Sequence, residues 1–91
     1  MKRIFKYPLP VDDEVVIPMP SGARILTVQA QNNLPCVWAV VTPDAEGMED
    51  RRFRVFGTGH PIPEGTDSLE YIGTFQLHNG RLVFHLFERV G

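Results

Sequence analysis

The chain has 91 residues, of which 43% are hydrophobic and 22% are charged, and its formal net charge is −2. This length supports one hydrophobic core, so we expect a single domain over residues 1–91. The small net charge excludes a global field that would attract long nucleic acid or an anionic membrane, and no run approaches the ~18–20 apolar residues of a membrane-spanning helix. Because the N-terminus also lacks the apolar run of a signal peptide, we expect a cytoplasmic protein.

Two short strands are predicted at the start of the chain. Residues 2–7 alternate between two faces, and Pro8 confines this strand to the edge of a sheet because proline has no backbone N–H to donate. Glu14–Ile17 is the second strand, and Pro18 and Pro20 follow it. Prolines at alternate positions protect an exposed strand edge from pairing with other chains.

A hairpin is predicted over residues 23–31 and 34–41, two runs rich in β-branched and aliphatic residues. They flank Asn32-Asn33, and asparagine tolerates the left-handed conformation that a two-residue turn requires. Such a turn pairs Gln31 with Leu34, Gln29 with Cys36, Val28 with Val37, Thr27 with Trp38, Leu26 with Ala39 and Ile25 with Val40. Leu26 then lies on one face and Ile25 on the other, and both faces are apolar. This is expected where a sheet closes on itself or is covered by a second layer.

A further strand is predicted over residues 51–56. Phe53 and Val55 share one of its faces, while Arg52 and Arg54 project from the other. These two arginines are the only local basic feature that the pattern brings to one face. They are therefore candidates for contact with an anionic ligand or partner.

The strongest hairpin signal lies between Leu69 and Val90, where two alternating runs flank Asn79-Gly80. These residues suit the two positive φ values of a type I′ turn. The predicted pairs are His78 with Arg81, Leu77 with Leu82, Gln76 with Val83, Phe75 with Phe84, Thr74 with His85, Gly73 with Leu86 and Ile72 with Phe87. The core face then carries Leu77/Leu82, Phe75/Phe84 and Gly73/Leu86. The opposite face exposes Ile72, Val83 and Phe87, which oligomerisation would cover.

These elements predict an all-β fold of about seven short strands joined by hairpins, either a small antiparallel barrel or a compact sandwich. No window has the sustained 3.6-residue apolar period of a helix. We expect at most one helical turn, around residues 45–48 or 63–68.

The strongest candidate for a ligand site is the glycine- and proline-rich loop that follows the strand over residues 51–56. Alternate glycines let the backbone approach a ligand closely, and exposed amides in such a loop can bind an anion. The alternative interpretation is a turn in which the glycines only supply unusual dihedral angles. The predicted ligand-binding residues are Arg52, Arg54, Gly57, Thr58, Gly59, His60 and Trp38.

The sequence has no pattern that indicates catalysis, a metal site or a cofactor. His60, His78 and His85 lack the spacing of metal ligands on one element, and His85 is expected to be a hydrogen-bonded structural residue. Cys36 lies in an apolar run and is expected to pack as a small hydrophobic residue. Because no nucleophile has an adjacent base, we expect a protein that is not an enzyme.

The chain resembles a small phage- and prophage-encoded family without an established function. The likeness covers most of the chain and rests on Phe5-Lys6-Tyr7-Pro8, Met19-Pro20-Ser21-Gly22-Ala23, Cys36-Val37-Trp38-Ala39, Phe53-Arg54-Val55, Gly57-Thr58-Gly59-His60-Pro61-Ile62, Tyr71-Ile72-Gly73-Thr74-Phe75-Gln76 and the run from Leu82 to Glu88. The resemblance carries over no catalytic residue.

The resemblance implies a non-catalytic accessory protein acting in the cytoplasm of a host cell. One hypothesis is a homo-oligomer that counteracts host defence, either by sequestering a nucleotide immune signal or by blocking a defence protein. The other is a structural or assembly accessory that docks a virion component through the apolar face of the C-terminal hairpin. Both rest on the class of genome and not on the residues.

Overall fold

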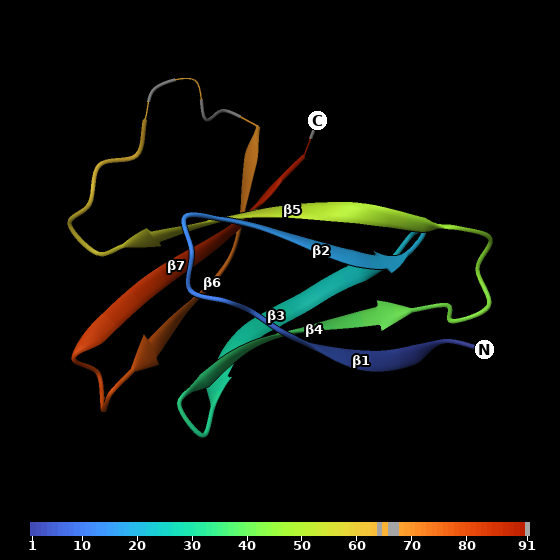
Figure 1. Cartoon of the computed structure of the whole chain (residues 1–91), viewed down its shortest axis with the longest axis horizontal. Helices are drawn as coiled ribbons and strands as arrows, with labels where there is room; N and C mark the ends of the chain where they lie inside the picture. Colours follow the sequence, from blue (N-terminus) through green and yellow to red (C-terminus); the bar gives the residue numbers. More distant parts are fainter. Residues whose placement is uncertain (64, 66–67, 91) are drawn as a thin grey trace.

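The structure is a computed structural model that describes residues 1–63, 65 and 68–90. Within these residues it consists of strands, turns and loops, without a helix. Its strands are β1 (Arg3–Pro8), β2 (Glu14–Pro20), β3 (Arg24–Gln31), β4 (Leu34–Val41), β5 (Met48–Gly57), β6 (Leu69–Leu77) and β7 (Leu82–Arg89) (Figure 1). The helical turn considered at residues 45–48 is not formed, and the one at 63–68 lies partly outside the described residues.

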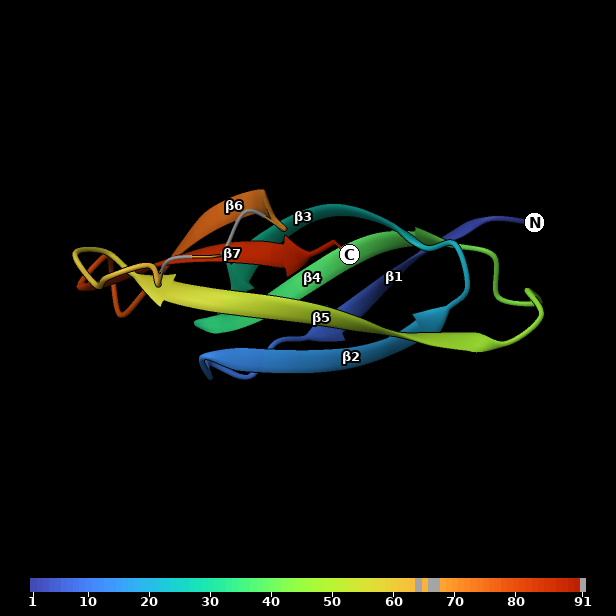
Figure 2. The ribbon, with the colours of Figure 1, turned by 90° about the horizontal axis from the view of Figure 1, so that it is seen from above.

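The strands form two antiparallel sheets, one with the order β1-β4-β3 and the other with the order β2-β5-β7-β6. The sheets do not join into a closed cylinder, so the fold is a sandwich and not a barrel. The outermost strands β3 and β6 lie side by side on one side of the sandwich (Figure 2). The other outermost strands, β1 and β2, are therefore left on the opposite side.

Both predicted hairpin turns are confirmed by their backbone angles. Asn32 and Asn33 have φ values of 51° and 64°, and Asn79 and Gly80 have 55° and 84°. His78 also has a positive φ, of 53°, so the predicted pair of His78 with Arg81 lies in the turn and the paired strands end at Leu77 and Leu82. The Arg81 N–H donates to the His78 carbonyl oxygen at 3.2 Å and closes the second turn. The predicted pairs that lie next to the turns are also confirmed, from Gln31–Leu34 to Thr27–Trp38 and from Leu77–Leu82 to Gly73–Leu86.

Each hairpin contains an irregularity that the predicted register missed. In β3 the register shifts between Ile25 and Thr27, so Ile25 and not Leu26 lies opposite Ala39. A bulge places an extra residue against the partner strand and reverses the alternation of faces beyond it. Ile25 consequently packs against the core, whereas Leu26 is 39% exposed.

The same correction applies to β6, where the shift falls between Tyr71 and Gly73. Tyr71 takes the place opposite Phe87 that was predicted for Ile72. Ile72 instead packs against the core as a partly buried residue. The apolar face that we assigned to Ile72, Val83 and Phe87 is therefore smaller than predicted.

The core lies between the two sheets and is built from the inward-facing residues of every strand pair. The largest fully buried side chains are Phe53, Met19, Leu86, Val37 and Val41. Burial of Phe75, Leu77 and Leu86 confirms most of the predicted core face of the C-terminal hairpin, although Leu82, next to its turn, is 43% exposed.

The β1-β4-β3 sheet is covered on its inner face only. Val37 and Ala39 point into the core, so Trp38 between them points outward and is half-buried. On the same outer face, Ile4 is 63% exposed. The prediction that this hairpin is buried on both faces is therefore wrong, because a two-layer sandwich covers each sheet once.

The two hairpins are fastened to one another near their tips. The Asn33 Oδ1 accepts a hydrogen bond from the His78 backbone N–H at 2.7 Å, and Asn33 Nδ2 lies 3.2 Å from His78 Nδ1. Further along, a Cβ on Gly73 would lie 3.0 Å from Val28 Cγ1, so glycine allows β6 to approach β3 closely. β3 and β6 are thus held together without a ladder of backbone hydrogen bonds between them.

Candidate functional site

The outer face of the β2-β5-β7-β6 sheet combines arginines with aromatic rings. Phe53 and Val55 are buried in the core, which places the alternate residues of β5 on the outer face. The register of the sheet brings residues of β7 and β6 to the same side. We call this surface the Arg54 face, and define it by Arg52, Arg54, Phe56, Tyr71, His85 and Phe87.

A chain of ring contacts organises this face. The guanidinium carbon of Arg54 lies 5.1 Å from the centroid of Phe56, within the range of a cation–π interaction. Phe56 meets Phe87 edge-on at 5.7 Å between centroids, and Phe87 meets Tyr71 at 5.4 Å. These neighbours leave Phe56 only 7% exposed although it lies on an outer face, while Tyr71 is 57% exposed.

Arg54 has polar contacts in addition to the ring. Its Nε donates to the Asp13 carbonyl oxygen at 3.2 Å, and its Nη1 lies 3.8 Å from Glu14 Oε1. The Glu14 side chain is 68% exposed, so water screens this ion pair. Arg54 is therefore held by the hydrogen bond from its Nε and by the contact of its guanidinium with the Phe56 ring. Its Nη1 lies near the carboxylate of Glu14, which is exposed and held weakly.

His85 is hydrogen-bonded at both ring nitrogens, as predicted for a structural residue. Its Nδ1 lies 2.9 Å from Thr74 Oγ1, and its Nε2 lies 2.7 Å from Thr58 Oγ1. Tyr71 extends the chain, since its hydroxyl lies 2.7 Å from Thr74 Oγ1. The hydroxyl–imidazole chain links β6, β7 and the loop after β5.

The loop over residues 57–60 is a tight turn. The His60 N–H donates to the Gly57 carbonyl oxygen at 3.0 Å, the Thr58 N–H donates to the Val83 carbonyl oxygen at 3.1 Å, and Gly59 has a φ of 86°. A Cβ on Gly57 would lie 2.9 Å from His60 Nδ1, so this glycine makes room for the histidine ring. Two of the loop amides are engaged within the protein, which favours the turn interpretation for the glycines.

The predicted ligand residues are brought together in part. Arg54 and His60 line one hollow of about 270 Å³ together with Asp13, Phe56 and nearby prolines. Arg52 lies next to it and lines a smaller hollow of about 70 Å³ with Arg54 and Arg89. Trp38 does not join them within one subunit, because it lies on the outer face of the other sheet.

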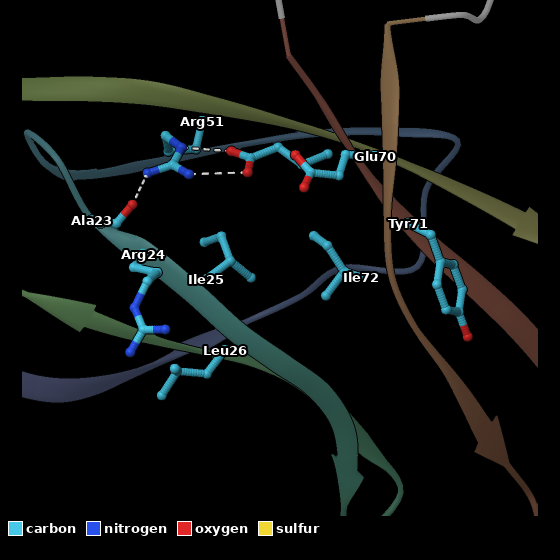
Figure 3. Close-up of a pocket in the computed structure, with 9 residues that line it drawn as sticks. Ala23, Arg24, Ile25, Leu26, Arg51, Glu70, Tyr71 and Ile72 are labelled. Carbon is cyan, nitrogen blue, oxygen red and sulfur yellow. Dashed lines mark hydrogen bonds and ion pairs between the residues drawn. The ribbon is translucent and has the colours of Figure 1, made fainter.

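Sequence reasoning missed a third hollow, of about 320 Å³, between β3 and β6 (Figure 3). Its wall carries an ion pair in which Arg51 donates to both carboxylate oxygens of Glu88, with 2.9 Å from Nη2 to Oε1. Arg51 Nη1 also donates to the Ala23 carbonyl oxygen. The hydrogen bonds that Arg51 donates to Glu88 raise the pKa of Arg51, although burial of the guanidinium opposes this.

The bulges of β3 and β6 open this hollow, since Leu26 and Ile72 both line it. Figure 3 shows Ile25 and Ile72 on either side of it. Arg51 has the same alternation as Phe53 in β5, so the strand pattern alone could have placed it on the inner face. The polar groups of the pair bond to one another, and this indicates a structural role.

Within residues 1–63, 65 and 68–90, no helix is long and apolar enough to cross a bilayer. In the same residues, no group of three His, Cys, Asp or Glu side chains is arranged to hold a metal ion.

Comparison with known families assigns the whole chain to one of them. A family model described as "Domain of unknown function (DUF7352)" matches residues 1–91. The chain belongs to this family. No curated protein and no solved structure matches the chain. The match covers the full length of the chain, and the description of the family assigns no activity to the Arg54 face.

Proposed function

We propose that this protein is a non-catalytic phage accessory protein that counteracts host defence by binding, and that it sequesters a nucleotide immune signal. The supporting observation is the Arg54 face, where a guanidinium stacked on Phe56 lies beside a hollow that His60 also lines. Arginine offers paired donors to a phosphate, and aromatic planes accept a base. A nucleotide combines both features.

Charge on this face favours an anionic ligand. Arg52, Arg54 and Arg89 line adjoining hollows, and Glu14 is the one carboxylate in ion-pair contact with Arg54 among the described residues. The carboxylate of Glu14 is 68% exposed and holds Nη1 weakly, so a phosphate group can replace it there. The exposed ring of Tyr71 offers an aromatic plane on the same sheet.

Binding without catalysis is favoured because, among the residues that the structure describes, the imidazole of His85 is hydrogen-bonded to two threonines and to no carboxylate. Thr58 and His85 form a hydroxyl–imidazole pair, but the other ring nitrogen meets the hydroxyl of Thr74. In hydrolases that use such a pair, a carboxylate stabilises the imidazolium that forms. An enzyme acting on a nucleotide is therefore the weaker hypothesis, and it predicts turnover that His60→Ala abolishes.

Isothermal titration of the purified protein with cyclic AMP, cyclic di-GMP and ADP-ribose tests the proposal. One of these probes should bind, and Arg54→Ala should weaken binding by about tenfold or more, because the bidentate contact and the stacked cation are both lost. Arg54→Lys should fail to restore it, since lysine lacks the planar fork. Arg24→Ala, on the other sheet, is the matched control and should bind as the unaltered protein does.

Absence of heat with all three probes, together with a host defence protein recovered by pull-down from infected cells, would transfer the function to blocking of that protein. Recovery of a virion component would instead support the alternative proposal of a structural or assembly accessory. The structure gives that alternative less apolar surface than the sequence suggested, because Ile72 packs inward and Phe87 is half-buried among other rings.

Self-association also remains a proposal. On the face of the C-terminal hairpin Tyr71 is 57% exposed, and on the other side of the sandwich Ile4 and Val16 are exposed apolar residues that contact between copies would cover.

A further inference from the structure

The two sheets expose their outermost strands unequally. β3 and β6 lie against each other and are fastened by Asn33 and His78. β1 and β2 have no strand beyond them among the described residues. A strand without a neighbour presents backbone N–H and C=O groups that can pair with another chain.

The direction of these groups on β1 follows from one hydrogen bond. The Leu9 N–H donates to the Pro35 carbonyl oxygen at 3.0 Å, toward β4. Backbone groups alternate along a strand, so the N–H and C=O of Ile4 and Lys6 point away from the sheet. Pro8 has the same alternation and offers a carbonyl oxygen only.

The same reasoning applies to β2. The Val55 N–H donates to the Asp13 carbonyl oxygen at 3.1 Å, toward β5. Glu14 and Val16 therefore point their backbone groups outward, as do Pro18 and Pro20, which have no N–H. Two residues on each free strand therefore have both a backbone N–H donor and a C=O acceptor that point outward. They are Ile4 and Lys6 on β1, and Glu14 and Val16 on β2.

Only one antiparallel register uses all four of these residues, and it places Ile4 opposite Val16 and Lys6 opposite Glu14. Ile4 is 63% exposed and Val16 is 47% exposed, so the first pair would bury two uncovered apolar side chains. The second joins opposite charges.

We propose that two copies of this chain form a closed dimer in which β1 of each copy pairs with β2 of the other in this register. β1 and β2 run in opposite directions on the same side of the sandwich (Figures 1 and 2). A twofold axis parallel to the strands then satisfies both contacts together, because it exchanges the two layers and preserves the strand direction. Each sheet of one copy continues into the other sheet of its partner.

In the dimer, Lys6 and Glu14 would exchange their present surface contacts for contact with one another. Lys6 Nζ donates to Gln31 Oε1 at 2.8 Å, and Glu14 lies 3.8 Å from Arg54. Both contacts are at the surface and hold their partners weakly. Pairing of Lys6 with Glu14 of the other copy draws the carboxylate away from Arg54.

Sedimentation velocity of the full chain over a wide range of concentration tests the dimer. Lys6→Glu or Glu14→Lys alone should weaken dimerisation by about tenfold or more, because like charges then face each other twice in the complex. The double variant Lys6→Glu/Glu14→Lys should restore it, since the pair is reversed. A monomer at every concentration would overturn the proposal, as would a dimer that ignores the single charge reversals.

A variant that alters the backbone distinguishes the effect of strand pairing on dimerisation from the effect of charge. Val16→Pro removes the outward N–H and continues the alternation that Pro18 and Pro20 already show in β2, so the fold should persist by circular dichroism. The variant should be monomeric, while Val16→Thr, which keeps the N–H, should still dimerise. Equal dimerisation by the two variants would contradict pairing through β2. Neither outcome depends on nucleotide binding.

Discussion

Glu88 is the one buried charged residue in the part of the chain that the structure describes, and it is held by two nitrogen atoms of Arg51. A buried pair adds little stability relative to an apolar pair, but loss of one member leaves the other charge without compensation. The pair therefore fixes how β5 and β7 meet the end of β3, where Arg51 also contacts Ala23.

Glu88→Gln should lower the free energy of unfolding by about 3 kcal/mol, because the largely buried guanidinium of Arg51 then keeps only the more exposed carboxylate of Glu49, 3.6 Å away, as a counter-charge. Urea unfolding followed by circular dichroism measures this. The double variant Arg51→Met/Glu88→Met should lose less free energy of unfolding than Glu88→Gln, since neither member of the pair remains as a buried charge. Equal stability of Glu88→Gln and the unaltered protein would show that the ion pair is solvated.

The raised pKa of Arg51 also determines how its contribution to the stability of the fold depends on pH. Because Glu88 raises this pKa in the folded state, the contribution of the guanidinium is fully present below the ordinary arginine value. It is lost only as the pH rises through the raised value in strong alkali.

At the level of single residues, the sequence predicted which side chains share a face and missed what they contact. Alternation placed Arg52 and Arg54 on one face correctly, because it depends only on the pleat of the strand. It did not reveal that Phe56 would be covered by Phe87, since this contact joins strands far apart in the chain. Trp38 lies on the other sheet from the arginines, and the division of the strands into two sheets depends on contacts that alternation does not predict.

At the level of elements, the two hairpins are joined at their tips by Asn33 and His78. Asn33→Gly should destabilise the protein by about 1 kcal/mol, because glycine keeps the positive φ and removes the hydrogen bonds to His78. Asn32→Gly is the matched control, since Asn32 also has a positive φ. The difference between the urea midpoints of the two variants measures how much the contact between Asn33 and His78 stabilises the fold.

An Asn33→Gly variant as stable as the unaltered protein would show that the tips are held by packing alone. A loss for Asn32→Gly of the same size would instead indicate a general effect of glycine on the turn.

The turns were predictable and the bulges were not, for a physical reason. Asn-Asn and Asn-Gly set the backbone angles of a turn from local sterics, and the register then follows for several residues. The bulges at Leu26 and Ile72 lie where β3 and β6 separate around the hollow, so they depend on packing between two sheets. No local sequence signal reports that contact.

At the level of the whole molecule, the all-β class followed from the number of hairpins, but barrel and sandwich could not be separated. Both need strands with apolar faces, and they differ in whether the outermost strands pair. Here a three-stranded and a four-stranded sheet stay separate, since β3 and β6 meet through side chains such as Val28.

Amide hydrogen exchange measured by NMR at low and high protein concentration checks the arrangement of the free strands. At low concentration, the amides of Ile4, Lys6, Glu14 and Val16 should exchange quickly, while those of Phe5 and Tyr7 are protected by β4. At high concentration the first group should become protected as the dimer forms. Exchange that does not change with concentration would show that these strands stay unpaired.

The neighbouring position of β3 and β6 has a consequence for solubility. Fibrils of the amyloid kind grow when a chain adds to an unpaired strand, and such a strand is most dangerous when it is long and lacks proline. β3 and β6 shield one another, and β2 carries Pro18 and Pro20 where a template would need donors. These features reduce the length of unpaired strand on which such a fibril could grow.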